Sequence, residues 1–467
     1  MAKAKLTIAV AGAVLGAAAL AGPGLLAGRL EARFRDWAEQ VSTPSHEVTV
    51  ERYERGWFSS TAEVSVALAL RGLTEPITLR GTETLRHGPV AFGGPCGVHL
   101  GLATVHSRLV VPERYAEEAR ARLFPGGALA TTCAYVGPAG DVEGEGRIAG
   151  YEGPIPGAVG AFTAVRWAPA TVRYRYSADL VERRVDIDAP RLEAHGRGER
   201  MAVEGMSFMV NSEQVHGPLQ NVSGRLDMAR MEVAMSDAGE ARATPLVYEQ
   251  PSFGFDSKVE SGRVNSSFSA TVRSGRVADD EFGTVELHLA LERLNAKAVQ
   301  RVSEQFQMLA ESGASVEEIQ QQSIALWLEA LPELVSDSPV LKIGPVTYEG
   351  EHGDLELHGE ATFDGREGFG SSQGLVQRLS ASAELSASAS LMLALEAKVL
   401  ENQLRKAGAT QLQIQRALSQ HRGQVLANWQ AQGLIEKAGE RYRSRLALES
   451  GRLTVNGRPL GLGGSVP

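Results

Sequence analysis

The chain has 467 residues, of which 43% are hydrophobic and 22% are charged. This is the composition of an ordinary folded protein, and the length is enough for one large hydrophobic core or two. Its 56 acidic residues outnumber its 47 basic residues, and the formal net charge of -9 argues against a nucleic-acid-binding protein, which would need a basic surface.

An uncharged segment between Lys5 and Arg29 comes first along the chain. As a helix, residues 6–27 would span roughly 33 Å at about 1.5 Å per residue, which matches the core of a bilayer. Lys3 and Lys5 form the positive flank that stays in the cytoplasm, so the remaining chain is expected on the far side of the membrane. The alternative is a cleaved signal peptide, because residues 19–21 (Ala-Leu-Ala) resemble a cleavage site. We favour the anchor, since the apolar run continues past that site.

After the anchor, the hydrophobic period predicts a short helix and then strands. Residues 29–41 indicate a charged helix that leaves the membrane and ends before Pro44. Alternating apolar residues then predict long antiparallel strands. These strands begin near Val48 and Val64 and recur at residues 172–176, 267–272, 285–289 and 446–455.

Three predicted helical segments interrupt the strands. Residues 112–124 have the composition of a surface helix. Residues 296–334 predict two helical pieces, the second of which starts at a capping box of Ser315 and Glu318. One apolar stripe of the first piece is formed by Val299, Val302, Phe306 and Leu309. The third segment begins near Leu391, breaks at Gly408 and continues past Trp429.

These elements predict an α+β protein, in which an N-terminal transmembrane helix precedes long, curved, mostly antiparallel β-sheets with packed α-helices. The glycine-rich stretch 137–160 is predicted to be a linker or a long loop. We divide the chain into an anchor at residues 1–28, a β-rich periplasmic half at 29–240, and a half with strands and long helices at 241–467. The alternative is that the two halves form one continuous domain.

Cys96 and Cys133 are the two cysteines of the chain. Their number is compatible with one disulfide in an oxidising periplasm, and such a bridge would contribute about 3 to 4 kcal/mol to stability. The alternative is two separate buried thiols. Neither a CxxC nor a CxxCH pattern is present, so the sequence predicts neither redox exchange nor covalent attachment of a c-type haem.

The stretch 370–374 matches the G-x-S-x-G pattern that would make Ser372 the nucleophile of a hydrolase. This motif needs a buried strand before the serine, whereas residues 364–369 are typical of a loop. The only later histidine, His421, falls in a predicted helix. We therefore favour a surface loop and keep a hydrolase using Ser372 as an alternative.

Two further patterns contain residue types found in metal and nucleotide sites. His352, Asp354, Glu356 and His358 share one face of a predicted strand. At about 3.3 Å per residue the two histidines lie roughly 20 Å apart, which favours a solvated face over a metal site. The glycines of residues 144–150 approach a dinucleotide-loop spacing but lack its strand and helix, so a loop is predicted. The sequence thus predicts no metal and no cofactor.

A resemblance to a known family begins at residues 53–60, Tyr-Glu-Arg-Gly-Trp-Phe-Ser-Ser. Further matches follow in order at His87-Gly88-Pro89, Leu331-Pro332, Pro339-Val340, Ile343-Gly344-Pro345 and residues 451–457. With these motifs and its apolar N-terminal segment, the chain resembles the YdgA-like family of uncharacterised Gram-negative envelope proteins. The motif positions of the first turn are Tyr53, Arg55, Gly56, Trp57, Phe58, Ser59 and Ser60.

The resemblance implies an inner-membrane-associated periplasmic protein without an established activity, in a family whose members include some linked to motility. It supplies no catalytic residue. In physical terms, Arg55-Gly56 suits a tight turn, and we expect Trp57-Phe58 to pack the hairpin onto a helix rather than meet the membrane interface.

Taken with the residue patterns, the resemblance predicts a noncatalytic, single-pass inner-membrane protein that acts in envelope maintenance or assembly. Its expected partners are the membrane, a lipid or an envelope protein, and not nucleic acid. A lipid-binding or lipid-transfer module with an apolar groove is the first alternative.

Overall fold

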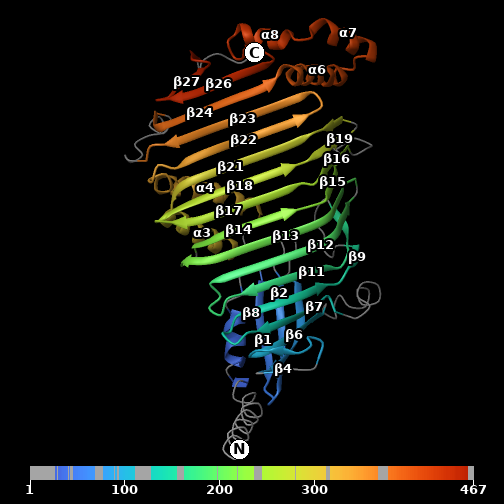
Figure 1. Cartoon of the computed structure of the whole chain (residues 1–467), viewed down its shortest axis with the longest axis vertical. Coiled ribbons are helices and arrows are strands. Elements are labelled where there is room, and N and C mark those ends of the chain that lie inside the picture. The colour runs from blue at the N-terminus through green and yellow to red at the C-terminus, as the bar shows by residue number, and fades with distance from the viewer. Residues whose placement is uncertain are drawn as a thin grey trace, which may run out of the picture. The chain divides into compact units, whose positions relative to one another are not determined.

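The computed structural model describes most of the chain from residue 27 to residue 460 (Figure 1). The described residues are 27–28, 30–39, 42, 46–68, 77–88, 90–91, 94–110, 128–154, 162–196, 198–217, 219–235, 244–278, 280–311, 316–365 and 377–460. The chain divides into two compact units. Unit 1 comprises Met1–Gln214 and Gly224–Pro245, and unit 2 comprises Val215–Ser223 and Leu246–Pro467.

The predicted class of mostly antiparallel β-sheets with packed helices is confirmed in both units. Within the described ranges, no helix is both long enough and apolar enough to cross a membrane. Several predicted features lie outside those ranges: the membrane segment up to residue 26, the helix at 112–124, the capping serine Ser315 and the stretch 370–374 with Ser372.

Unit 1 is built on antiparallel strands that pair mostly in chain order. The strands β1 (His46–Glu54), β2 (Ser59–Leu68), β3 (Ile77–His87), β6 (Ala103–Val110), β7 (Ala130–Val136), β8 (Val142–Ile148), β11 (Ala170–Tyr176), β12 (Glu182–Gly196), β13 (Arg200–His216) and β15 (Arg230–Met235) follow one another. The later half of β12 pairs instead with β10 (Phe162–Trp167), which also pairs with β9 (Tyr151–Pro154). A separate hairpin consists of β4 (Val90–Ala91) and β5 (His99–Leu100).

The described part of the glycine-rich stretch 137–160 is not a loop, so this prediction is wrong. Strands β8 and β9 occupy it, and both Gly144 and Gly146 lie within β8. The ring of Tyr174, on the neighbouring strand β11, lies where a Cβ at Gly144 would be. Here glycine admits a large side chain from the next strand, which is a known use of glycine inside a sheet.

A helix at residues 27–28 and 30–39, called here the N-terminal helix, precedes β1. It matches the predicted charged helix. Its buried residues include Ala27, Leu30 and Ala38. Ser42 links the helix to the sheet, because its hydroxyl donates to the Ala38 carbonyl at 2.7 Å and accepts the Val48 amide at 2.9 Å.

Unit 2 is also antiparallel. The strands β17 (Ser252–Glu260), β18 (Arg263–Val272), β21 (Thr284–Asn295), β22 (Val340–Gly350), β23 (Gly353–Phe363), β24 (Leu379–Ser388), β26 (Arg441–Glu449), β27 (Arg452–Val455) and β28 (Arg458–Pro459) pair in this order. Further strands are β14 (Leu219–Asp227) and β16 (Thr244–Glu249), of which residues 219–223 and 246–249 belong to unit 2, and β19 (Ser274–Val277), β20 (Asp280–Phe282) and β25 (Glu436–Ala438). β14 pairs with β17, β16 with β19, β19 with β20, and β25 with β26.

The helices of unit 2 confirm the two later helical predictions. The helices α3 (Ala296–Glu311) and α4 (Val316–Leu334) form the expected two pieces and pack through Ala298, Val302, Ala330 and Leu334. The third segment comprises α6 (Ala389–Lys406), α7 (Gln411–His421) and α8 (Gln424–Ala431). It has a second break that was not predicted, at Gly423, whose φ is 74°. Figure 1 shows α6, α7 and α8 together beside β24 and β26.

The predicted solvated strand face in unit 2 is confirmed in part, because Asp354 is half-buried and pairs with Arg441 at 2.5 Å. Glu356 and His358 are exposed on β23 and contact each other at 2.8 Å, whereas His352 precedes the strand. Among the residues that the structure describes, no cluster of potential metal ligands was found.

Candidate functional site: a cavity beneath the N-terminal helix

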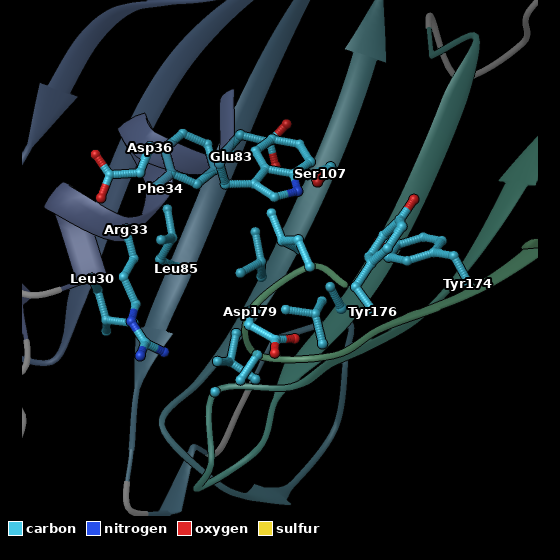
Figure 2. Close-up of a pocket in the computed structure, with 18 residues that line it drawn as sticks. Leu30, Arg33, Phe34, Asp36, Glu83, Leu85, Ser107, Tyr174, Tyr176 and Asp179 are labelled. Atoms are coloured by element: carbon cyan, nitrogen blue, oxygen red, sulfur yellow. Dashed lines mark hydrogen bonds between the residues drawn. The ribbon is translucent and has the colours of Figure 1, made fainter. Parts of the chain in front are cut away.

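A cavity of about 300 Å³ lies in unit 1 between the N-terminal helix and one face of the sheet (Figure 2). Its lining is largely apolar on the sheet side and carries charged groups on the helix and the turns. The lining residues are Leu30, Arg33, Phe34, Asp36, Trp37, Glu83, Leu85, Val105, Ser107, Ala134, Val136, Gly140, Val142, Tyr174, Tyr176, Ala178, Asp179 and Leu180. The volume is at the lower end of the range for small-ligand sites.

The cavity forms because residues of different size lie in one row across five neighbouring strands. In register, Leu85 faces Val105, Val105 faces Ala134, Ala134 faces Gly144, and Gly144 faces Tyr174. Side chains of paired residues point to the same face of a sheet. The Tyr174 ring covers Gly144, whereas Ala134 contributes only a methyl group, so the space beside Ala134 is left unfilled between the larger side chains of the row.

Glu83 is the buried acidic group of this cavity. It lies opposite Ser107 in the register of β3 and β6, and the Ser107 hydroxyl donates a hydrogen bond to Glu83 Oε2. Glu83 is only 6% exposed. Burial raises the pKa of its carboxyl from 4.5 to about 7, and the hydrogen bond from Ser107 opposes this rise. Near neutral pH a large fraction of the carboxyl is therefore uncharged and able to donate a hydrogen bond.

Two tyrosines on β11 complete the polar interior. Burial is the main cause that raises the pKa of both Tyr174 and Tyr176, so both phenols stay neutral at physiological pH. Tyr174 also has a side-chain hydrogen bond with Thr132, which opposes the rise in its pKa. The two rings lie 5.6 Å apart between centroids. The inner wall thus offers hydroxyl groups without a fixed charge.

Charged side chains gather at the rim. Arg33 and Asp36 of the N-terminal helix and Asp179 of the β11–β12 turn are all exposed. Hydrogen bonds from the Ser177 hydroxyl and the Val181 amide hold the pKa of Asp179 below its usual range. The Arg33 guanidinium packs over Gly140, where a Cβ would overlap it. Figure 2 shows Glu83 and Ser107 at one end of the cavity and Asp179 at the other.

Part of the first family-like motif meets His87 in a buried hydrogen-bonded group. Ser60 Oγ lies 3.0 Å from His87 Nε2, and His87 Nδ1 lies 3.1 Å from the Trp57 carbonyl oxygen. Since a carbonyl only accepts, Nδ1 carries the proton and Nε2 accepts from Ser60. The pair resembles the serine and histidine of a hydrolase, but a carbonyl replaces the usual carboxylate. Both side chains are at most 3% exposed and neither lines the cavity, so we assign them a structural role.

The rest of the motif positions the N-terminal helix. Arg55 Nη2 contacts Glu31 Oε2 at 2.5 Å, and this contact lowers the pKa of Glu31. The rings of Tyr53 and Phe34 lie 6.2 Å apart between centroids. Because Phe34 lines the cavity, these contacts hold one wall of the site in place.

The prediction that Trp57 and Phe58 pack onto a helix is wrong. Their side chains are 58% and 54% exposed. The turn itself is tight as expected, since a Cβ at Gly56 would overlap the Ser59 carbonyl. The buried Ser60 and His87 close the turn from inside, which leaves the two aromatic side chains facing outward.

The two cysteines pair as proposed from the sequence. The structure joins Cys96 and Cys133 in a disulfide with a Cα–Cα distance of 5.5 Å.

Glu83, Ser107 and Tyr174 were not identified as site residues from the sequence. One signal was present, because Glu83 shares the inward register with the buried residues Leu79 and Leu85 of β3. A carboxyl on the apolar face of a strand marks a candidate site.

Comparison with known proteins adds one match. Residues 1–462 match the model of a family described as "Bacterial protein of unknown function (DUF945)". Neither a curated protein nor a solved structure matches the chain. The family match covers nearly the whole chain but brings no reaction or ligand, so the role of the cavity has to follow from its own chemistry.

Proposed function

We propose a ligand-binding role for this chain, which belongs to the bacterial family of unknown function DUF945. In this proposal it is a noncatalytic, membrane-anchored envelope protein that binds one small, largely apolar ligand in the cavity of unit 1. A single acyl chain with an uncharged or weakly polar end fits this description. The observation that carries the proposal is an apolar hollow whose buried polar groups are neutral or nearly so.

The distribution of polarity supports an amphipathic ligand. Leu85, Val105 and Ala134 provide apolar surface along the row of small residues, and burying an acyl chain against such surface is favourable by about 25 cal/mol per Å². The charged groups lie at the rim, where the polar end of a ligand would reach solvent. A pocket built for a charged metabolite would instead place a countercharge inside.

Glu83 and Ser107 supply the orienting contact. In its protonated form Glu83 can donate to a carbonyl oxygen of an ester or a fatty acid, while it accepts the hydrogen bond from Ser107. Ionisation of Glu83 would place a charge against the apolar chain and weaken binding. The proposal therefore expects tighter binding below about pH 7 than above it.

The envelope setting is supported by the position of the cavity along the chain. The lining residues Leu30, Phe34 and Trp37 follow the uncharged run 6–27 within ten residues. A helix advances about 1.5 Å per residue, so a cavity there would lie within roughly 15 Å of the membrane surface, where lipid ligands are available. The disulfide between Cys96 and Cys133 also suits an oxidising compartment such as the periplasm.

The test is ligand binding by the full chain and by a variant whose hollow is filled. Ala134→Phe places a ring in the centre of the cavity, and Ala438→Phe, on the exposed strand β25 of unit 2, is the matched control. We expect native mass spectrometry with lipid extraction to find one acyl ligand per chain in the wild type and the control. Titration with a dansyl-labelled fatty acid should show at least about tenfold weaker binding by Ala134→Phe.

Ala134→Leu, a smaller change, keeps the test meaningful if the phenylalanine disturbs folding. It should weaken binding less than Ala134→Phe while the thermal unfolding midpoint stays near that of the wild type. Equal binding by all four proteins, or no binding by the wild type, would contradict the proposal.

A further inference from the structure

Five exposed apolar residues gather at one end of the unit 1 sheet, and we call them the end patch. They are Trp57 (58% exposed), Phe58 (54%), Val90 (44%), Val98 (73%) and Leu100 (72%). The first two are on the β1–β2 turn, and the others belong to the β4–β5 hairpin. Large apolar groups exposed together mark a contact surface more often than singly exposed ones do.

A continuous set of backbone hydrogen bonds places the turn and the hairpin next to each other. The His87 amide donates to the Phe58 carbonyl at 2.9 Å, and the adjacent Gly88 amide donates to the Leu102 carbonyl at 2.6 Å. Two residues further along each strand, Val90 pairs with Leu100. Both segments therefore leave the sheet where β3 ends and β6 begins.

Contacts with β7 fix the position of the β4–β5 hairpin, which carries part of the end patch. The disulfide fixes Cys96 to Cys133 of β7, and the Tyr135 hydroxyl donates to the Cys96 carbonyl at 3.2 Å. The rings of His99 and Tyr135 lie 4.4 Å apart between centroids. These contacts hold Val98 and Leu100 outward instead of letting them fold back onto the sheet.

The turn lies beside the residue at which the uncharged run of the chain ends. A terminal guanidinium nitrogen of Arg55, two residues before Trp57, lies 3.7 Å from where a Cβ of Gly28 would be. Gly28 directly follows the uncharged residues 6–27. If that run crosses a bilayer, Gly28 is at the membrane surface, and the β1–β2 turn lies at the same level.

We propose that the end patch inserts into the headgroup region of the bilayer that holds residues 6–27. Tryptophan and phenylalanine favour this interfacial layer, where an apolar ring can leave water without entering the hydrocarbon core. The inference rests on the membrane anchor of the proposed function, but not on ligand binding in the cavity. Its consequence is a second attachment point, which fixes the orientation of unit 1 on the membrane.

The experiment uses the full chain reconstituted into vesicles of phosphatidylethanolamine and phosphatidylglycerol. Flotation first establishes that the chain is anchored. Tryptophan emission is then compared between ordinary lipids and lipids with brominated acyl chains, which quench nearby indoles. The variants are Trp57→Phe and, as the matched control, Trp429→Phe on α8, which is 40% exposed in the wild type.

We expect brominated lipid to quench wild-type emission and Trp57→Phe to lose most of that quenching, whereas Trp429→Phe keeps it. The double variant Val98→Ser, Leu100→Ser retains every tryptophan and should also lose much of the quenching, because the patch inserts less deeply.

A chain that floats with the vesicles but whose quenching does not depend on Trp57 would overturn the inference and leave the anchor intact. If quenching does not depend on Trp57 and crosslinking finds a dimer joined through the end patch, the patch would instead be a contact surface for a second copy of the chain. A chain that does not float would overturn the anchor itself, while ligand binding in the cavity can still be measured separately.

Discussion

Replacing Glu83 with glutamine should remove a pH-dependent loss of stability in unit 1. Burial gives the folded state a pKa of about 7 for this carboxyl, compared with 4.5 for a solvated glutamate. Between these two values the folded state binds more protons than the unfolded state, so stability falls as the pH rises through this window. The stabilisation is fully present below about pH 4.5 and lost above about pH 7.

The size of this loss follows from the two pKa values. At about 1.4 kcal/mol per pH unit, the difference corresponds to about 3 kcal/mol. Glu83→Gln keeps an oxygen that accepts the Ser107 hydrogen bond but cannot ionise. The variant should therefore resemble the wild type near pH 5 and be more stable by up to about 3 kcal/mol near pH 8.5.

Hydrogen exchange measured by mass spectrometry suits this test, because it reports on β3 and β6 in the full chain. Protection of peptides from these strands is followed between about pH 5 and about pH 8.5, after correction for the intrinsic exchange rate. Glu63→Gln, on the exposed side of β2, is the matched control and should behave as the wild type does. Parallel pH profiles for the wild type and Glu83→Gln would refute the reasoning.

Two other substitutions test contacts that stabilise unit 1 outside the cavity. Ser60→Ala removes the buried hydrogen bond between Ser60 Oγ and His87 Nε2, so unit 1 should lose about 1 to 3 kcal/mol of stability. Ester hydrolysis assayed with nitrophenyl esters should stay at background for both proteins. A loss of hydrolysis in the variant would instead make Ser60 a nucleophile. Cys133→Ser opens a bridge between residues 37 apart in sequence and should cost about 4 kcal/mol, measured by urea unfolding without reductant. An unchanged midpoint would show that the bridge does not constrain the unfolded chain.

The later helices were predictable because their apolar residues repeat with a helical period. Val302 and Phe306 of α3 lie on the stripe that packs against α4, as their spacing indicates. The break at Gly423 was missed because glutamine and leucine on both sides favour helix. Helix propensity and apolar spacing thus predict where the helices lie, but they do not predict every break within a helical segment.

The stretch 137–160 shows that a high glycine content alone does not indicate a loop. Its residues Glu143, Glu145 and Arg147 are exposed and alternate with the buried Gly144 and Gly146, so the period of a strand was present. The missing part of the argument was the neighbour, since only the register with Tyr174 explains why glycine is needed there. A partner thirty residues away cannot be inferred from composition.

The cavity could be anticipated only in part. An inward-facing Glu83 is visible in the alternation of β3, and a charged residue at such a position is unusual. Its neighbours Ser107 and Tyr174 come from strands whose pairing depends on the whole sheet. The turn motif can be identified from adjacent residues, whereas the cavity depends on the register between strands that are distant in the sequence.

If the cavity binds an acyl ligand as proposed, the size of the residues in the row from Leu85 to Tyr174 would limit the length of that ligand. Ala134 is the position where a larger residue would shorten the hollow without changing any strand pairing, because the ring of Tyr174 already occupies the space beside Gly144. Homologous chains could therefore accommodate ligands of different length by exchanging this one side chain on an unchanged backbone. Among such chains, bulkier residues at the position of Ala134 should accompany shorter bound ligands, so residue size there can serve to sort sequences into binding classes.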